Sequence, residues 1–168
     1  MKKFIIFLIT VLAFFVQPVL AEVITTEKTN GYADYVYVAG EPDNYPIEYY
    51  AEDTKSYKGV IPDLLLKVSE RSGINFIYIN GDKRDKNLLG GNLQVDIVSS
   101  SYSTASYAKD YLNLISYKED GNIIKVGIVF TTLAQDSKIA KIKDALNDIS
   151  ASEKNGIYLS YASQNIKA

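Results

Sequence analysis

The fold is decided by residues 35–104, whose landmarks read YVYVAG (35–40), GVIPDLLLKVSERSG (59–73), INFIYI (74–79) and QVDIVSSSYST (94–104). The first landmark is β-branched and aromatic and stops at a glycine, so it predicts a strand. The second has apolar residues at helical spacing, with Pro62 and Asp63 in its first turn and Gly73 after its end, and it predicts a helix. The last two predict strands. Strands that alternate with helices in this way are typical of an α/β sheet with right-handed crossovers.

The rest of the chain predicts a smaller set of elements. An Asp-Gly pair at 120–121 separates two apolar runs and predicts a β-hairpin. In chain order we expect a long loop at 41–58 holding a short strand at 47–50, a short helix at 84–89, hairpin strands at 111–117 and 122–130, an amphipathic helix at 137–150, and a last short helix that Ser152 caps and that buries Ile157, Tyr158 and Tyr161.

The N-terminus predicts a targeting segment. Lys2 and Lys3 precede an apolar run at 4–16, and small residues stand before Ala21. This pattern is typical of a cleavable secretory signal peptide at 1–21, and the run is short for a bilayer span. An uncleaved membrane anchor is the alternative. We expect export to a periplasm or to the outside medium, without a lipid anchor because no cysteine is present.

Composition narrows the function classes. The chain of 168 residues has 18 basic and 20 acidic side chains, a net charge of −2, and loses two of its lysines if the signal is cleaved. An acidic balance argues against nucleic acid as a partner. The chain has no histidine and no cysteine, which removes the commonest catalytic bases and metal ligands. We expect a protein that is not an enzyme and holds no cofactor, although a serine with Lys109 as base is the formal alternative.

At this point the chain resembles extracellular solute-binding proteins of family 3, the amino-acid receptors of ABC importers. The resemblance covers roughly residues 34–105, and the tail at 126–161 is similar to the family's returning strand and final helices. The matching segments are the strand end 37–40, the proline-aromatic turn 45–49, the glycine and acid-bearing helix start 59–64, and the segment 91–98 with its serine turn at 100–104.

The resemblance implies a fold and a function. The fold is α/β, a single lobe of the type II periplasmic-binding-protein kind, with a mixed and mostly parallel sheet flanked by helices. Residues 22–168 form that domain, and the family's second lobe is missing or reduced to the hairpin at 110–125. The implied partners are a small polar solute such as an amino acid, and the membrane subunit of an ABC importer. A homodimer partner is a further expectation, because a second copy would supply the missing wall.

The predicted solute site comes from two loops. Open α/β sheets bind ligands at the carboxyl ends of their strands. The family contacts its ligand's carboxylate with an arginine after the serine turn, and here the nearest cation is a lysine, which is a point charge and not a fork. The expected ligand-binding residues are Asp43, Tyr45, Tyr49, Ser100, Ser101, Ser103 and Lys109.

Each candidate has a plainer interpretation. The acids Glu41, Asp43, Glu48, Glu52 and Asp53 are either cation ligands or a solvated loop, and their spacing favours the loop. The loop tyrosines line a pocket or pack at a strand edge, and the serines bind a ligand or form an ordinary polar turn. Two alternatives to solute binding remain open: a single-lobe protein-interaction or sensor module without a free ligand, and a remnant that binds nothing.

Overall fold

The computed structural model describes residues 34–79, 95–99 and 108–163. Five strands form one sheet in the order β5-β1-β6-β8-β7, and three more form a small antiparallel sheet in the order β2-β3-β4. The elements are β1 (Tyr35–Ala39), β2 (Asp43–Asn44), β3 (Glu48–Ala51), β4 (Ser56–Lys58), α1 (Val60–Ser72), β5 (Asn75–Tyr78), β6 (Ile97–Ser99), β7 (Ala108–Glu119), β8 (Asn122–Thr131), α3 (Asp136–Asn147) and α4 (Ala151–Ala162).

The five-stranded sheet is mixed, as predicted. β1 pairs in parallel with β5 and β6, whereas β8 pairs antiparallel with both β6 and β7. Parallel and antiparallel pairings are therefore equal in number, so the sheet is less parallel than predicted. The tight turn between β7 and β8 forces these two strands to pair antiparallel, and β8 also runs antiparallel to β6.

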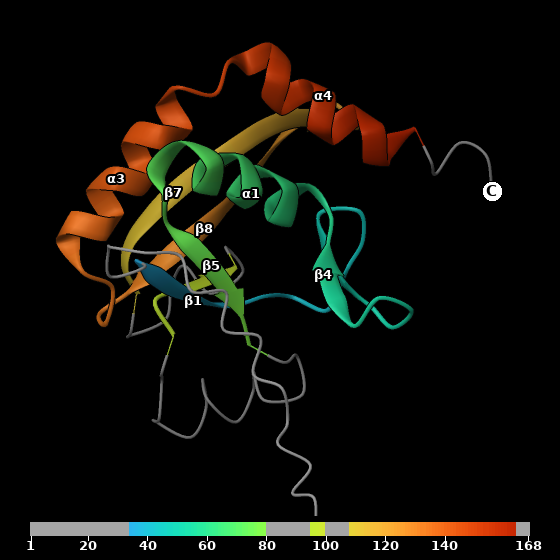
Figure 1. Cartoon of the computed structure of the whole chain (residues 1–168). Coiled ribbons are helices and arrows are strands. Elements are labelled where there is room, and N and C mark those ends of the chain that lie inside the picture. Colours follow the sequence, from blue (N-terminus) through green and yellow to red (C-terminus); the bar gives the residue numbers. More distant parts are fainter. Residues whose placement is uncertain (1–33, 80–94, 100–107, 164–168) are drawn as a thin grey trace, which may run out of the picture. The chain divides into compact units, whose positions relative to one another are not determined.

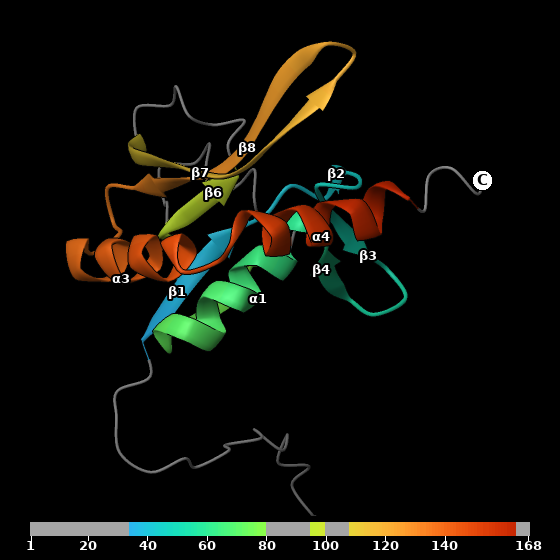
Figure 2. The same cartoon turned by 90° about the horizontal axis from the view of Figure 1, so that it is seen from above.

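The described helices lie together on one face of the large sheet (Figures 1 and 2). Helix α1 begins after Gly59 and ends at Gly73, whose left-handed conformation lets its N–H donate to the carbonyl of Ser69. This confirms the predicted helix and its predicted stop. Because apolar residues recur at helical spacing, α1 turns a continuous buried stripe toward the sheet.

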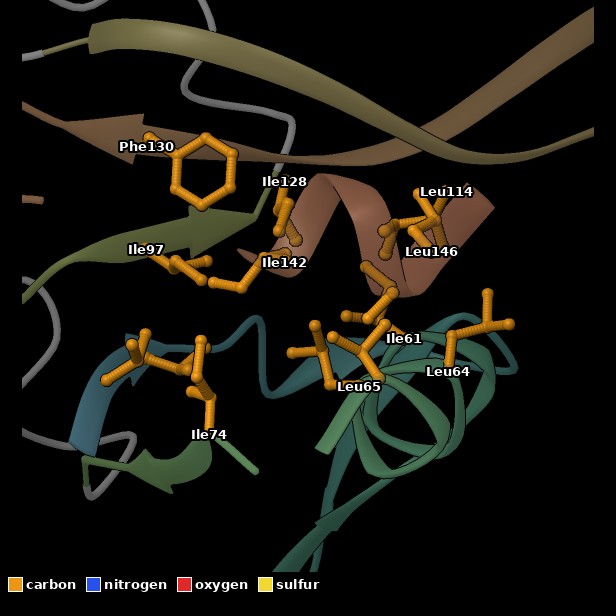
Figure 3. Close-up of a cluster of buried hydrophobic side chains, with 14 of the residues drawn as sticks. Ile61, Leu64, Leu65, Ile74, Ile97, Leu114, Ile128, Phe130, Ile142 and Leu146 are labelled. Carbon is orange, nitrogen blue, oxygen red and sulfur yellow. The ribbon is translucent and has the colours of Figure 1, made fainter. Parts of the chain in front are cut away.

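The core fills the space between this helical layer and the sheet. Apolar side chains from α1, α3 and the strands interdigitate, with Phe130 as the largest fully buried one. Figure 3 shows how the helical side chains point toward those of the strands. The labelled members are Ile61, Leu64, Leu65, Ile74, Ile97, Leu114, Ile128, Phe130, Ile142 and Leu146.

Two local predictions were wrong. The segment 41–58 is not a loop with one strand, because its ends pair with its centre to form the three-stranded sheet. Helix α4 is capped by Ser150 and not by Ser152: the Ser150 hydroxyl accepts a hydrogen bond from the N–H of Glu153 at 3.2 Å. Ile157, Tyr158 and Tyr161 pack against the core as predicted, but they are half-buried and not buried. The helix predicted at 84–89 lies outside the described residues.

Candidate functional site

The small sheet lies at the carboxyl edge of the large one. β1 and β5 run in parallel and end side by side at Ala39 and Tyr78, so both release the chain at this edge. The Tyr57 hydroxyl reaches the carbonyl of Gly40 at 3.4 Å, which ties β4 to the end of β1. The segment 41–58 therefore covers the carboxyl ends of these strands, the region at which open α/β sheets bind ligands.

A buried carboxylate organises this region. Glu48 in β3 is fully buried. Its carboxylate oxygens accept hydrogen bonds from the Tyr78 hydroxyl at 2.9 Å and from the N–H of Glu41 at 2.6 Å. Burial, followed by the charge and hydrogen bond of Glu48, raises the pKa of Tyr78 well above its usual value, so that this hydroxyl stays a donor. For Glu48 the prediction of a solvated loop acid was wrong.

Three tyrosines extend from this carboxylate along one face of the small sheet. Tyr57 and Tyr78 are stacked with ring centroids 4.7 Å apart, and Tyr50 meets Tyr57 edge-on at 5.4 Å. Tyr50 and Glu48 are two residues apart in β3 and so share this face. We call Tyr50, Tyr57 and Tyr78 the tyrosine wall. A cavity of about 450 Å³ lies beside it, lined by Tyr50, Lys55, Ser56, Tyr57, Tyr78 and Ile79.

The predicted residues of the first loop meet on the opposite face of the small sheet. Asp43 is the direct cross-strand neighbour of Tyr49, and the rings of Tyr45 and Tyr49 approach to 5.0 Å at a tilt of 58°. Burial raises the pKa of Tyr49, and the neighbouring Tyr45 adds to this effect. The structure therefore brings Asp43, Tyr45 and Tyr49 together, on a different face from the cavity.

Helix α4 reaches this second face at its C-terminal end. The Tyr161 hydroxyl donates to the Asp63 carboxylate at 2.9 Å. Burial is the main cause that raises the pKa of Tyr161 to about 12, and the hydrogen bond to Asp63 follows. Since Asp63 stands in the first turn of α1, this contact joins the last helix to the edge that carries the small sheet.

Gly59 makes the close approach between the small sheet and α1. Its φ is 123°, and an added Cβ would lie 2.6 Å from the carbonyl oxygen of Ile47. That carbonyl accepts the N–H of Ile61 at 3.0 Å, and Pro46 accepts the N–H of Val60 at 3.2 Å. Two of the free N–H groups at the start of α1 are thus satisfied by the segment that bears the tyrosines.

Lys109 lies at the opposite end of the strands from the small sheet. It stands near the start of β7, which pairs with the end of β8, and the end of β8 pairs with the start of β6. Its ammonium group donates to the carbonyl of Ala134 at 3.1 Å and pairs with Asp136 at 2.8 Å. The prediction that Lys109 shares one site with the loop tyrosines therefore does not match its position.

The remaining predicted residues lie outside the described part of the chain: Ser100, Ser101 and Ser103. Sequence reasoning missed Tyr78 as a lining residue. The available signal was the alternation in β5, which places Tyr78 at the end of the strand beside β1. Among the described residues, no group of three or more acids is placed to hold a metal ion.

Comparison with solved structures identifies the fold. The periplasmic VFT2 domain of Bordetella pertussis BvgS matches with a TM-score of 0.55 at 12% identity, covering 76% of this chain and 93% of that one. Substrate-binding domain 2 of Lactococcus lactis GlnP, in its open conformation, also gives 0.55, at 11% identity and with 79% and 97% covered. This is the type II periplasmic-binding fold. The described residues form a single lobe of it, and the predicted fold class is confirmed.

A third match agrees with these two. An ancestral cationic amino acid solute-binding protein gives a TM-score of 0.54 at 8% identity, with 76% of this chain and 95% of that one covered. No protein-family model matches the sequence. The comparison with curated proteins gives no match either. At such identities the agreement lies in the arrangement of strands and helices, and the tyrosine wall is a property of this chain's own residues.

Proposed function

We propose that this chain is an exported, non-catalytic binding protein for a small polar solute, and that the solute lies in the cavity beside the tyrosine wall. The observation that carries the proposal is the cavity itself. It lies at the carboxyl edge of a periplasmic-binding lobe, and its volume of about 450 Å³ is within the range of small-molecule sites. An amino acid or a related compound fits such a volume.

The lining residues support a solute that is partly flat and partly polar. Tyrosine rings offer apolar faces with a hydroxyl at the rim. The Tyr78 hydroxyl is held by Glu48, so the ring that forms one side of the cavity is fixed before any solute arrives. A fixed wall lowers the conformational cost of binding. Lys55 and Ser56 add polar groups, and the Lys55 ammonium is held by Glu52 at 2.6 Å.

Export and transport belong to the same proposal. The predicted signal peptide at 1–21 would take the domain 22–168 out of the cytoplasm, and the membrane subunit of an ABC importer is the partner that would receive the solute. Among the described residues, no helix has the length and apolar character needed to cross a membrane. The matched domains of BvgS and GlnP share the fold on which this proposal is based.

A thermal-shift screen of the exported chain tests the proposal. The panel holds amino acids, polyamines, sugars and organic acids, each at millimolar concentration. A solute present at 100 times its dissociation constant stabilises the folded state by about 2.7 kcal/mol, which such a screen detects. Any stabilising compound is then titrated by calorimetry. A panel of this breadth without a single stabilising compound would count against solute binding.

Two matched variants locate the solute. Tyr50 lies in β3 of the small sheet and Tyr45 in the turn between β2 and β3, and of the two only Tyr50 lines the cavity. We expect Tyr50→Ala to weaken binding by roughly fivefold or more and Tyr45→Ala to leave it unchanged, because a lost aromatic contact is worth about 1 kcal/mol or more. The reverse result would move the site to Asp43, Tyr45 and Tyr49, together with the serines of the next loop.

A further inference from the structure

The tip of the β7–β8 hairpin has a defined backbone pattern. Its turn has two residues, Asp120 and Gly121, with positive φ values of 47° and 81°. The strands pair from Glu119 and Asn122 inward, with Lys118 opposite Ile123 and Ser116 opposite Lys125. In a hairpin with a two-residue turn the closing pair is hydrogen-bonded, and bonded and unbonded pairs then alternate. Ser116 and Lys118 therefore turn their backbone N–H and C=O groups outward.

That outer edge is open in the described structure. β7 is the last strand of the sheet, and none of the described strands pairs with its outer side. Figure 2 shows the hairpin extending beyond the other strands. A row of outward N–H and C=O groups is a template for a further strand. The end of β7 beyond its last register irregularity, from Ile115 to Glu119, is regular enough to accept one.

A groove runs alongside this edge. Helix α4 contacts the hairpin through Tyr158, whose ring stacks on Tyr117 with centroids 4.3 Å apart. A cavity of about 510 Å³ lies between the two elements, lined by Ser116, Tyr117, Lys118, Ile123, Asn155, Tyr158 and Leu159. Two apolar side chains of this lining are largely in solvent, Ile123 at 65% exposure and Leu159 at 59%. The groove thus offers apolar surface directly beside free backbone groups.

The hairpin end carries its two lysines on one face of the ribbon. The whole chain carries a net charge of −2. The register places Lys118 and Lys125 on one face of the hairpin, with Lys118 directly opposite Ile123 and Lys125 two residues further along β8. Both lysines are exposed, and neither forms an ion pair with a described residue. Of the two acids at this end, Glu119 lies on the other face of the ribbon, with Tyr117, and Asp120 lies in the turn. This face therefore favours an acidic partner.

We propose that the hairpin end binds an extended acidic segment of another protein as an added strand. We name the surface the docking strip and define it as Ser116, Tyr117, Lys118, Ile123, Tyr158 and Leu159. The segment pairs with the outward backbone groups of β7, places alternate apolar side chains in the groove, and presents carboxylates to the lysines. This is the strand-addition mode of peptide recognition, in which backbone bonds supply affinity and alternate side chains supply specificity.

A second copy of the chain fits the docking strip less well. Antiparallel pairing of two β7 strands about Tyr117 would bring Lys118 and Lys125 of both copies onto the same face, because directly opposite residues share a face. Like charges placed in this way repel one another. An acidic segment instead neutralises the lysines, which is why we assign the partner to a different protein. The proposal is independent of solute binding, since the docking strip and the tyrosine wall share no residue.

The first test uses a synthetic probe. A fluorescent, N-acetylated and C-amidated octapeptide of alternating glutamate and valine is titrated with the exported chain at low salt and followed by anisotropy. The control peptide has the same sequence, with alternate backbone amides N-methylated to remove the donors that face β7. We expect saturable binding of the probe that weakens at least roughly tenfold on N-methylation and falls as salt is raised. Equal binding of both peptides, or no binding, would overturn the proposal.

Variants of the protein complete the test. Ser116→Pro removes an outward N–H at an edge position, where proline is tolerated, and Ser116→Ala is its matched control. We expect the proline variant to lose probe binding and the alanine variant to keep it, with unchanged melting temperatures for both. Lys118→Glu should weaken the probe by roughly tenfold and favour a peptide with lysine in place of glutamate. A dimer in light scattering that Ser116→Pro dissociates would replace the acidic segment with a second copy and overturn our assignment.

Discussion

Strands of the large sheet end both at the carboxyl edge and at the hairpin end. The first of these regions is covered by other parts of the chain, and the second is open. At the carboxyl edge a small sheet folds over β1 and β5, and a buried carboxylate ties it down. At the hairpin end β7 keeps an open side, with exposed apolar residues and lysines nearby. Buried polar bonds thus give one region a fixed surface, whereas the other region keeps its backbone groups available.

Removal of the buried carboxylate of Glu48 should have the largest effect on the difference between the two regions, because it destabilises the carboxyl edge. Glu48→Ala removes the buried carboxylate that accepts from the Tyr78 hydroxyl and the Glu41 N–H. We expect the free energy of unfolding to fall by about 3 kcal/mol, because each buried unsatisfied group costs about 1–3 kcal/mol. Urea unfolding measures it. Glu48→Gln retains one acceptor oxygen and should lose less, and an alanine variant as stable as the parent would show that the carboxylate does not hold this edge.

Glycines provide the next comparison. Gly59→Ala places a Cβ 2.6 Å from a carbonyl oxygen at a φ of 123°, and we expect it to destabilise the protein by roughly 2 kcal/mol. Gly156 in α4 is its opposite, since an added Cβ meets no atom within 4 Å. Gly156→Ala should stabilise by up to about 1 kcal/mol through helix propensity. Thermal unfolding of both variants checks the pair, and shifts of the same sign would contradict the contrast between the two regions.

Removal of the aromatic contact of α4 has a smaller expected effect. Tyr158→Ala deletes the stack with Tyr117 and should lower the free energy of unfolding by about 1–2 kcal/mol. Hydrogen exchange of the α4 amides should accelerate more than that of α1. Leu159→Ala is the control, because this exposed side chain lines the groove without supporting the helix. We expect Leu159→Ala to leave stability unchanged while it weakens probe binding.

The smallest expected effect concerns the hydrogen bond between Tyr161 in α4 and Asp63 in α1, and it depends on pH. The pKa of Tyr161 is raised in the folded state to about 12 by burial and by its hydrogen bond to Asp63, against 10.0 for the unperturbed group. A raised folded pKa means that this contribution is complete below pH 10 and is lost as the pH rises through 12. The melting temperature of Tyr161→Phe should therefore fall less steeply between pH 10 and 12 than that of the parent. Parallel curves would show that the hydroxyl does not couple α4 to α1.

Elements whose signals are local could be predicted from the sequence. Gly73 follows an apolar stripe and stops α1, and Asp120 with Gly121 forms the expected hairpin turn. The cap of α4 also has a local signal, since Ser150 and Glu153 have the spacing of a capping box, and the prediction of Ser152 as the cap was wrong. Where two serines compete, the backbone conformation decides between them, and the Ser150 backbone is extended as a cap requires.

The site was harder to predict because it depends on pairs that are distant in sequence. The segment 41–58 has the prolines and acids of a loop, yet it forms a sheet whose buried Glu48 accepts a hydrogen bond from Tyr78, thirty residues away. Alternation in β3 then sends Tyr49 and Tyr50 to opposite faces, which separates the predicted loop residues from the cavity. The position of Lys109 follows from strand order, which no local pattern records.

The two-residue turn at Asp120 and Gly121 has a further consequence. It is an exposed junction at the outer end of a ribbon, where the chain leaves one strand and enters the next. Paired strands lie about 5 Å apart, so only a guest domain with closely spaced termini could be spliced there without unzipping the ribbon. The turn is therefore a position at which such a domain could be inserted while β7 and β8 stay paired.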